Sequence, residues 1–325
     1  MATQLTHAHL PTNAPLPKYK KAQPMVFAGL YPKDGDDSRL RTLLNKLILN
    51  ESSIHIEEEY SKALGAGFRC GFLGMLHLQI IRERLEGEFG AELLITAPSV
   101  AYQVYTHKRE HLSITNASFF PSFELIEYVE EPIMAITITL PDAQVGDVMQ
   151  LTTKRKGIYR SLNYSAGQAV LEYEIPAAEI AYDFFNRLKS LTNGYASMES
   201  RFLRYHQADI VRIDIHINYI PVDALTILAH RQDAHTIAAD LVVKLKHIVP
   251  RKLYPMPVQA IVENKAIARA DIPPLRKNQS VNGEKRSLSK QKTLLRRQSV
   301  NKKRMAQLDI NLPQEVFNTL LEVYN

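Results

Sequence analysis

The sequence predicts an α+β protein in which two tandem ferredoxin-like (βαββαβ) domains precede a third α+β domain with a basic tail. The first observation is the order of short β-type runs and amphipathic helical patterns between residues 21 and 100, which follows βαββαβ. The second is that the same order returns over residues 131–208. The third is charge, because the positive excess of the chain lies near its C-terminus.

The first domain is predicted over residues 21–100, after a proline-containing linker at residues 1–20. Acidic capping candidates precede its first helix, and proline closes its first strand. In chain order its elements are a strand PMVFAGLYP (24–32), a helix DGDDSRLRTLLNKLILN (34–50), strands SSIHIEEEY (52–60) and GAGFRCGFL (65–73), a helix GMLHLQIIRERLEGEF (74–89) and a strand AELLITAP (91–98).

The second domain is predicted over residues 131–208, after a connector at residues 101–130. The dipeptide Asn193-Gly194 is typical of a helix end. The two domains do not resemble each other in sequence, so only the architecture repeats. In chain order the elements are a strand EPIMAITITLP (131–141), a helix DAQVGDVMQLTTKRKG (142–157), strands IYRSLNY (158–164) and QAVLEYEIP (168–176), a helix AAEIAYDFFNRLKSLTNG (177–194) and a strand YASMESRFLRY (195–205).

The third domain is predicted over residues 209–325. Its clearest signal is the strict alternation of DIVRIDIHINY, which is typical of a strand. Asp233 is the expected cap of the main helix, which Pro250 ends. The elements are a strand at 209–219, a helix at 233–249, a hairpin at 256–272 that turns around Asn264-Lys265, and a last helix at 313–324, and the run VDALTILAH (222–230) is more apolar than the first strand.

The single cysteine, Cys70, precedes His77 by seven residues and raises the question of a thiol nucleophile with its base. A strand end and a position inside the next helix need not face each other, and no orienting carboxylate is evident. The alternative is a small buried thiol at a strand-to-helix junction, where Gly67, Gly71 and Gly74 allow close backbone approach. We favour this structural interpretation and predict no catalytic residue.

Nucleotide and metal motifs are not found in the sequence. Neither G-x-x-x-x-G-K-[ST] nor a G-x-G-x-x-G that opens a helix occurs. His107 and His111 have i,i+4 spacing, but they lie in a stretch without a helical pattern and near no other ligand candidates. We therefore expect no metal site and no nucleotide pocket.

The basic segment at residues 276–305 gives the strongest functional signal. It holds eleven lysines and arginines and one acidic residue, so it carries +10 in a chain whose net charge is +6. Cations at this density contact phosphates without regard to base sequence. The predicted RNA-binding residues are Arg276, Lys277, Lys285, Arg286, Lys290, Arg296, Arg297, Lys302, Lys303 and Arg304.

Two alternatives to an RNA-binding protein stay open, a thiol enzyme using Cys70 and a basic protein of the membrane surface. The basic segment lacks an apolar stripe beside its charges, which disfavours membrane binding. The N-terminus has no apolar signal region, and no run approaches the ~20 apolar residues of a membrane span. Together with the lone cysteine, these observations lead us to expect a cytoplasmic protein.

Several stretches resemble the LepA (elongation factor four) family of translational GTPases. The helix entry FLGMLHLQIIRERL is similar to an element in domain III of elongation factor G and its relatives. Further matches to LepA run in family order from about residue 15 to the end. They are residues 23–32, GFRCGFLG (67–74), ITAPSVAYQV (95–104), LEYEIPAAE (171–179), DFFNRLKS (183–190), GYAS (194–197), PPLRKN (273–278), KKRM (302–305) and LPQE (312–315).

The resemblance implies domains III and V of such a factor followed by a LepA-type C-terminal domain. The first predicted domain ends near Pro98 and the second begins near Glu131, so the domain IV of elongation factor G does not fit between them. The family's GTPase domain and the β-barrel after it have no counterpart in these residues. The tail also departs from the family, because Glu284-Lys285-Arg286-Ser287 replaces a Tyr-Gly-Gly-Asp turn.

By resemblance, the expected partners are the ribosome, through its 23S rRNA, and tRNA. The family is a ribosome-dependent GTPase of protein synthesis, associated with back-translocation, and it binds GTP and Mg²⁺. For this chain alone we expect no cofactor and no enzyme activity. We also expect a monomer, with peripheral membrane association as a further implication of the resemblance.

Overall fold

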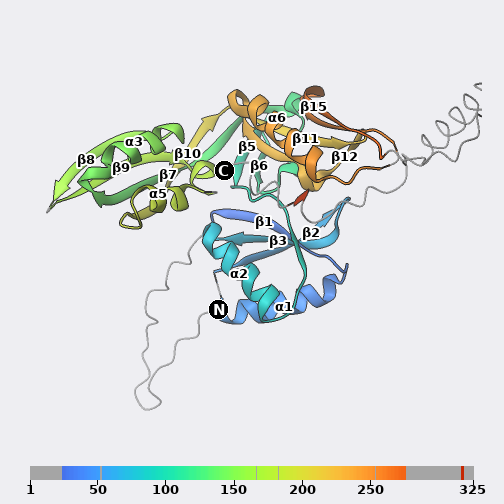
Figure 1. Cartoon of the computed structure of the whole chain (residues 1–325), viewed down its shortest axis with the longest axis horizontal. Coiled ribbons are helices and arrows are strands. Elements are labelled where there is room, and N and C mark those ends of the chain that lie inside the picture. Colours follow the sequence, from blue (N-terminus) through green and yellow to red (C-terminus); the bar gives the residue numbers. More distant parts are fainter. Residues whose placement is uncertain are drawn as a thin grey trace, which may run out of the picture.

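The computed structural model describes residues 24–51, 53–165, 167–181, 183–252, 254–275 and 316–317. They form three β-sheets with helices, arranged as the three units labelled in Figure 1. This confirms the predicted α+β class. Within these described residues, no helix combines the length and the apolar composition needed to cross a membrane.

The first unit is a four-stranded antiparallel sheet covered on one face by two helices. Its strand order is β2-β3-β1-β4, which is the ferredoxin-like order that the sequence predicts. Leu44 and Ile81 from the two helices share one buried cluster with Cys70 and Phe72 from the sheet. The elements are β1 (Val26–Pro32), α1 (Asp37–Asn50), β2 (His55–Ser61), β3 (Gly65–Phe72), α2 (Met75–Gly87) and β4 (Leu93–Ile95).

The second unit repeats this order as β10-β7-β9-β8 and adds a hairpin to it. Tyr173 and Phe184 are fully buried between the sheet and its helices. The elements are β5 (Tyr102–Thr106), β6 (His111–Ile114), η1 (Ala117–Phe119), η2 (Phe123–Leu125), β7 (Ile126–Pro141), η3 (Asp142–Gln144), α3 (Val145–Lys154), β8 (Ile158–Ser165), β9 (Gln168–Pro176), α4 (Ala177–Ala181), α5 (Phe184–Leu191) and β10 (Ser197–Ala208).

The third unit is a sheet in the order β12-β11-β14-β15, with β13 also paired to β11. Helix α6 packs against β14 and β15, and Val316 and Phe317 are buried in the same core. The rest of the predicted helix at 313–324 lies outside the described residues. The elements are β11 (Ile210–Ile217), β12 (Ile220–Pro221), η4 (Asp223–Leu225), β13 (Ile227–His230), α6 (Arg231–Ile248), β14 (Met256–Val262) and β15 (Lys265–Ile272).

The stretch 101–130 differs from the plain connector that the sequence predicts. It contains the β5–β6 hairpin and the start of β7, which begins at Ile126, before the predicted Glu131. β5 pairs with the first residues of β7, and β9 pairs with later residues of the same strand. The stretch therefore extends the second sheet.

Three local predictions also need correction. Asp183 leaves the helical region (φ −125°, ψ 1°), which divides the predicted helix at 177–194 into α4 and α5. Asp233 does not cap α6, because the N-cap position belongs to His230 and the Asp233 carboxylate binds Lys156 at 2.6 Å. The hairpin turns at Glu263-Asn264, both with positive φ, one residue before the predicted position.

Candidate functional site

The ten predicted RNA-binding residues, from Arg276 to Arg304, lie outside the described residues. Their assignment remains a prediction from charge. The described part of the chain offers a different candidate, a cavity where the three units meet. The pair Cys70 and His77, which the sequence singled out for chemistry, lies in the first unit.

Cys70 and His77 have separate surroundings. Cys70 is completely buried in the first core, and this burial raises the pKa of its thiol to about 12. His77 Nδ1 accepts a hydrogen bond from the Leu73 N–H at 3.1 Å, and its Nε2 lies 4.0 Å from the Glu51 carboxylate. Burial lowers the His77 pKa. These are the contacts of a core thiol and of a histidine at a helix start, as the structural interpretation predicts.

The glycines around Cys70 follow that interpretation in part. A Cβ on Gly67 would meet the Tyr31 ring and the Leu30 carbonyl oxygen, and a Cβ on Gly71 would lie 2.8 Å from Pro24. Both positions therefore need close backbone approach. Gly74 faces open space, so that part of the prediction is wrong.

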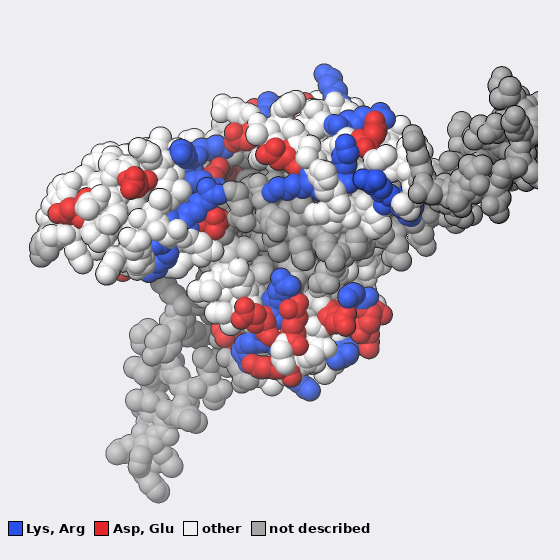
Figure 2. Space-filling model, in the orientation of Figure 1, with Lys and Arg blue, Asp and Glu red and all other residues white. Residues whose placement is uncertain are grey.

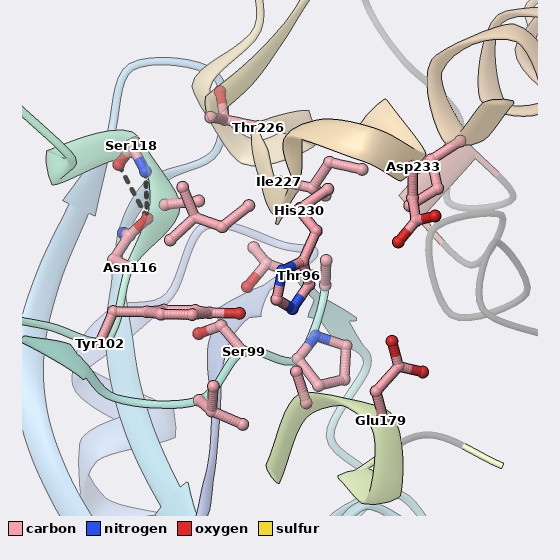
Figure 3. A pocket seen from close by; sticks show the side chains of 18 of the residues that line it. Thr96, Ser99, Tyr102, Asn116, Ser118, Glu179, Thr226, Ile227, His230 and Asp233 are labelled. Carbon is pink, nitrogen blue, oxygen red and sulfur yellow. Dashed lines mark hydrogen bonds between the residues drawn. The ribbon is translucent and has the colours of Figure 1, made fainter. Parts of the chain in front are cut away.

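The cavity between the units has a volume of about 480 Å³. Figure 3 shows the Tyr102 ring, Thr96 and the His230 ring directed toward a common space, with Glu179 and Asp233 at its other side. Its walls come from the segment after β4, from β5 and η1, from the end of α3, from α4, and from η4 through the start of α6. All three units contribute, so the cavity marks their junction.

A buried polar network lies on the first-unit side of this junction. The Tyr31 hydroxyl donates to Glu59 Oε2 at 2.9 Å, and the Asn116 side-chain amide donates to Glu59 Oε1. Burial and the adjacent Glu59 carboxylate raise the pKa of Tyr31. Arg69 donates to Ser99 Oγ at 2.7 Å. The network joins the first sheet to the chain that leads into the second unit.

Asp223 in η4 connects the third unit to the first. Its carboxylate accepts hydrogen bonds from Ser61 Oγ at 2.9 Å and from the backbone N–H of Lys62 at 2.7 Å. The N–H of Ala63 donates to it at 3.3 Å. Ser61 Oγ in turn accepts from the N–H groups of Ala63 and Leu64, so Asp223 and Ser61 together satisfy the donors of the turn that follows β2 and hold this turn against the third unit.

Charged side chains connect the second unit to the third. Lys156, just after α3, donates to Asp233 Oδ2 at 2.6 Å and lies 3.4 Å from Glu179. Arg155 lies 3.5 Å from the same Glu179. These four groups form a chain of alternating charge across the junction, and they lie partly open to solvent.

A buried pair reinforces the same contact. His230 Nε2 at the end of β13 lies 3.1 Å from Glu131 Oε2 on β7. The Glu131 side chain is only 6% exposed, so an uncompensated charge there would be costly. This pair joins the sheets of the second and third units.

The junction has the chemistry of a structural joint. The carboxylates of Glu59, Glu179, Asp223 and Asp233 already bind hydroxyl, amide or backbone N–H donors or cations of the protein itself. In the part of the chain that the structure describes, no group of three histidine, cysteine or acidic side chains is placed to hold a metal ion. The arrangement keeps three units in one relative position.

Sequence reasoning missed Glu59, Asp223 and Lys156. Each is an ordinary charged residue in its local sequence, and each acquires its role only through a partner far along the chain. Asp223 and Ser61, for example, are 162 positions apart. The local pattern around these three residues therefore carries no signal that could have found them.

Family models match two adjacent parts of the chain. The model described as GTP-binding protein LepA C-terminus matches residues 217–322. The model described as Elongation factor G C-terminus matches residues 128–216. Their boundary falls near the passage from the second to the third unit.

Curated relatives match almost the whole chain. Elongation factor 4 2 of Lactiplantibacillus plantarum is 49% identical over 98% of this chain and 54% of its own length. Elongation factor 4 of Thermosynechococcus vestitus is 44% identical over 99% of this chain and 54% of its own length. Elongation factor 4 of Anoxybacillus flavithermus is 45% identical over 98% of this chain and 53% of its own length. The chain thus spans about half the length of the curated relatives it matches.

A solved structure from Thermus thermophilus aligns with a TM-score of 0.40 and 19% identity, over 61% of this chain and 43% of that one. A likeness at this level supports no conclusion about fold or function.

Proposed function

We propose that this chain, which corresponds to the C-terminal part of the LepA (elongation factor 4) family of translation factors, is the ribosome- and RNA-binding portion of such a factor. The observation that carries the proposal is the match to elongation factor 4 proteins at 44–49% identity over 98–99% of the chain. The two ferredoxin-like units would dock on the large ribosomal subunit through its 23S rRNA, and the third unit would reach toward a bound tRNA.

The basic segment supplies the phosphate contacts in this proposal. The ten predicted RNA-binding residues of this segment neutralise backbone charge and release counterions, which makes binding strongly salt-dependent. The chain acts as a monomer in the cytoplasm. In this proposal the chain itself neither binds nor hydrolyses GTP, because its sequence has neither of the glycine-rich phosphate-binding motifs.

The test is cosedimentation of the purified chain with ribosomes at increasing salt. We expect the chain to pellet at low salt and to be released steeply as salt rises. A variant with Arg296, Arg297 and Lys302 changed to alanine should be released at lower salt. Failure of the unaltered chain to pellet even at low salt would contradict the proposal.

A further inference from the structure

The end of α6 carries a group of exposed cations that the junction does not use. Lys246 and His247 lie in the last turn of the helix, and Arg251 follows it directly after Pro250. All three side chains are exposed, and no ion pair involves Lys246 or Arg251 within the described residues. We call Lys246, His247 and Arg251 the α6 patch.

The α6 patch differs from the other charged surfaces of the protein. Most other arginines in the described part of the chain are paired, as Arg160 is with Glu174 and Arg231 is with Asp209. Figure 2 shows several lysine and arginine side chains on the third unit, at the right of the view, with acidic side chains among them. Around the patch, the sequence has no acidic residue from position 241 to position 262. The cations of the patch therefore have no acidic residue among their neighbours in the chain.

Helix stability explains only part of this charge. Cations in a last turn interact favourably with the helix dipole, which accounts for Lys246 and His247. Arg251 lies beyond the helix, after a proline, and gains nothing comparable. It adds a further positive charge directly beyond the same helix end.

The position of the α6 patch links it to the basic segment. The Leu275 N–H donates to the Lys252 carbonyl oxygen at 2.7 Å. Leu275 therefore lies beside Arg251, and the next two residues are Arg276 and Lys277, the first of the predicted RNA-binding cations. This hydrogen bond brings the start of that segment close to the patch, although Arg251 and Arg276 are far apart in the sequence.

We propose that the α6 patch is a preformed phosphate-binding surface, and that an RNA strand bound by the basic segment continues across it. This inference rests on the proposed function and adds a second, folded contact to it. RNA fits the patch better than a lipid surface, because its apolar neighbours are few. Val243 and Leu275 are exposed beside the cations, but they form no stripe that could enter a bilayer.

The experiment measures binding of the full chain to a synthetic RNA stem-loop by fluorescence anisotropy, between roughly 50 and 200 mM salt. Lys246→Ala combined with Arg251→Ala removes two phosphate contacts. The slope of log K against log salt should become shallower by about 1.4 to 1.8, and affinity at low salt should fall about tenfold or more. Both side chains are exposed, so the variant should keep the parent's thermal transition.

The matched control is Lys46→Ala combined with Lys108→Ala, two exposed lysines on α1 and on the β5–β6 turn. It removes the same charge far from the patch and should leave the slope unchanged. An equal loss in both double variants would show a general charge effect and overturn the inference.

The tail variant separates this inference from the proposed function. If changing Arg296, Arg297 and Lys302 weakens RNA binding while the patch variant binds like the parent, the patch proposal fails and the proposed function stands. If neither variant differs from the parent, both fail. Binding to vesicles of anionic but not neutral lipid, without binding to the RNA, would also overturn both.

Discussion

The first and second units share one strand order, but they enclose their cores differently. The buried cluster of the first unit contains only residues from its own sheet and helices, between positions 28 and 95. The cluster of the second unit also takes in Val26 from the first unit and Ile210 and Leu228 from the third. The same topology thus gives one self-contained unit and one that is shared with its neighbours.

The difference follows from the central strands. β1 in the first unit spans 7 residues, whereas β7 in the second spans 16. Because β7 is long, both β5 and β9 pair with one of its edges, one after the other. β10 pairs with most of the opposite edge of β7. A long central strand therefore makes the second unit the one through which the others are connected.

The largest expected effect comes from truncating the core of the second unit. Phe184 is fully buried, and Phe184→Ala should lower the free energy of unfolding by about 3–5 kcal/mol. Because this core is shared, hydrogen exchange should accelerate in β5 and β11 as well as in the second unit itself. Denaturant unfolding with amide exchange measures both effects.

The matched variant in the first unit is Phe72→Ala, which removes an equally buried ring. Its cost should be similar, but the loss of exchange protection should be confined to β1–β4 and their helices. Loss of protection in the third unit with this variant would contradict the distinction between the two cores.

The next largest effect on stability is expected at Gly67 in the first unit, where the backbone lies close to the Tyr31 ring. Gly67→Ala places a Cβ against the Tyr31 ring and 2.7 Å from the Leu30 carbonyl oxygen, which should cost about 1–3 kcal/mol. In the second unit, Gly146 lies in α3 with open space around it. Gly146→Ala should therefore stabilise the protein by about 0.5–1 kcal/mol. Thermal denaturation of the two variants should show shifts of opposite sign.

The two junction contacts should differ in strength. Asp223→Ala leaves the Lys62 N–H and the Ser61 hydroxyl without the carboxylate that accepts from them and should cost about 1–3 kcal/mol. Lys156→Ala breaks partly exposed ion pairs and should cost less than about 1 kcal/mol. Denaturant midpoints measure both, and the cost for Lys156 should shrink at high salt while that for Asp223 should not. The reverse order would show that charge, not backbone hydrogen bonding, dominates the junction.

The smallest effect concerns pH. Arg160 and Arg204 donate to Glu174 at 2.8 and 2.7 Å and lower its pKa to about 2. A lowered carboxylate pKa gives stability that is present above the unfolded pKa of about 4.3 and is lost as pH falls through about 2. Glu174→Gln should therefore flatten the acid side of the stability curve of the second unit. Unchanged acid unfolding in this variant would count against the two arginine contacts.

The order of elements could be predicted because each depends on local pattern. The leucine spacing of α1 and the alternation of β11 are visible within a few residues. The strands β5 and β6 were missed because they are 5 and 4 residues long and gain definition only by pairing with β7. Asp233 was misjudged for a related reason, since its partner Lys156 is 77 positions away.

Of the two candidate sites, the sequence predicts the basic segment but not the junction of the three units. Charge density could be read from composition alone, so the basic segment was found without any structure. The junction could not be predicted from the sequence, because Glu59 and Asp223 find their partners only when separate units meet. Cys70 shows the opposite case, in which a conspicuous residue has an inconspicuous role, set by complete burial.

The hydrogen bond between Leu275 and Lys252 has a consequence for avidity. It holds Leu275, the residue before the basic segment, beside the α6 patch, so an RNA bound by one of these two groups, as we propose, would meet the other at a high effective concentration. Linked weak sites of this kind can exceed their separate affinities by about 10²–10⁴ without any new contact. Two small cation clusters joined at a fixed point would then bind RNA tightly at low salt. The RNA would still dissociate quickly once one of the two clusters is displaced from it.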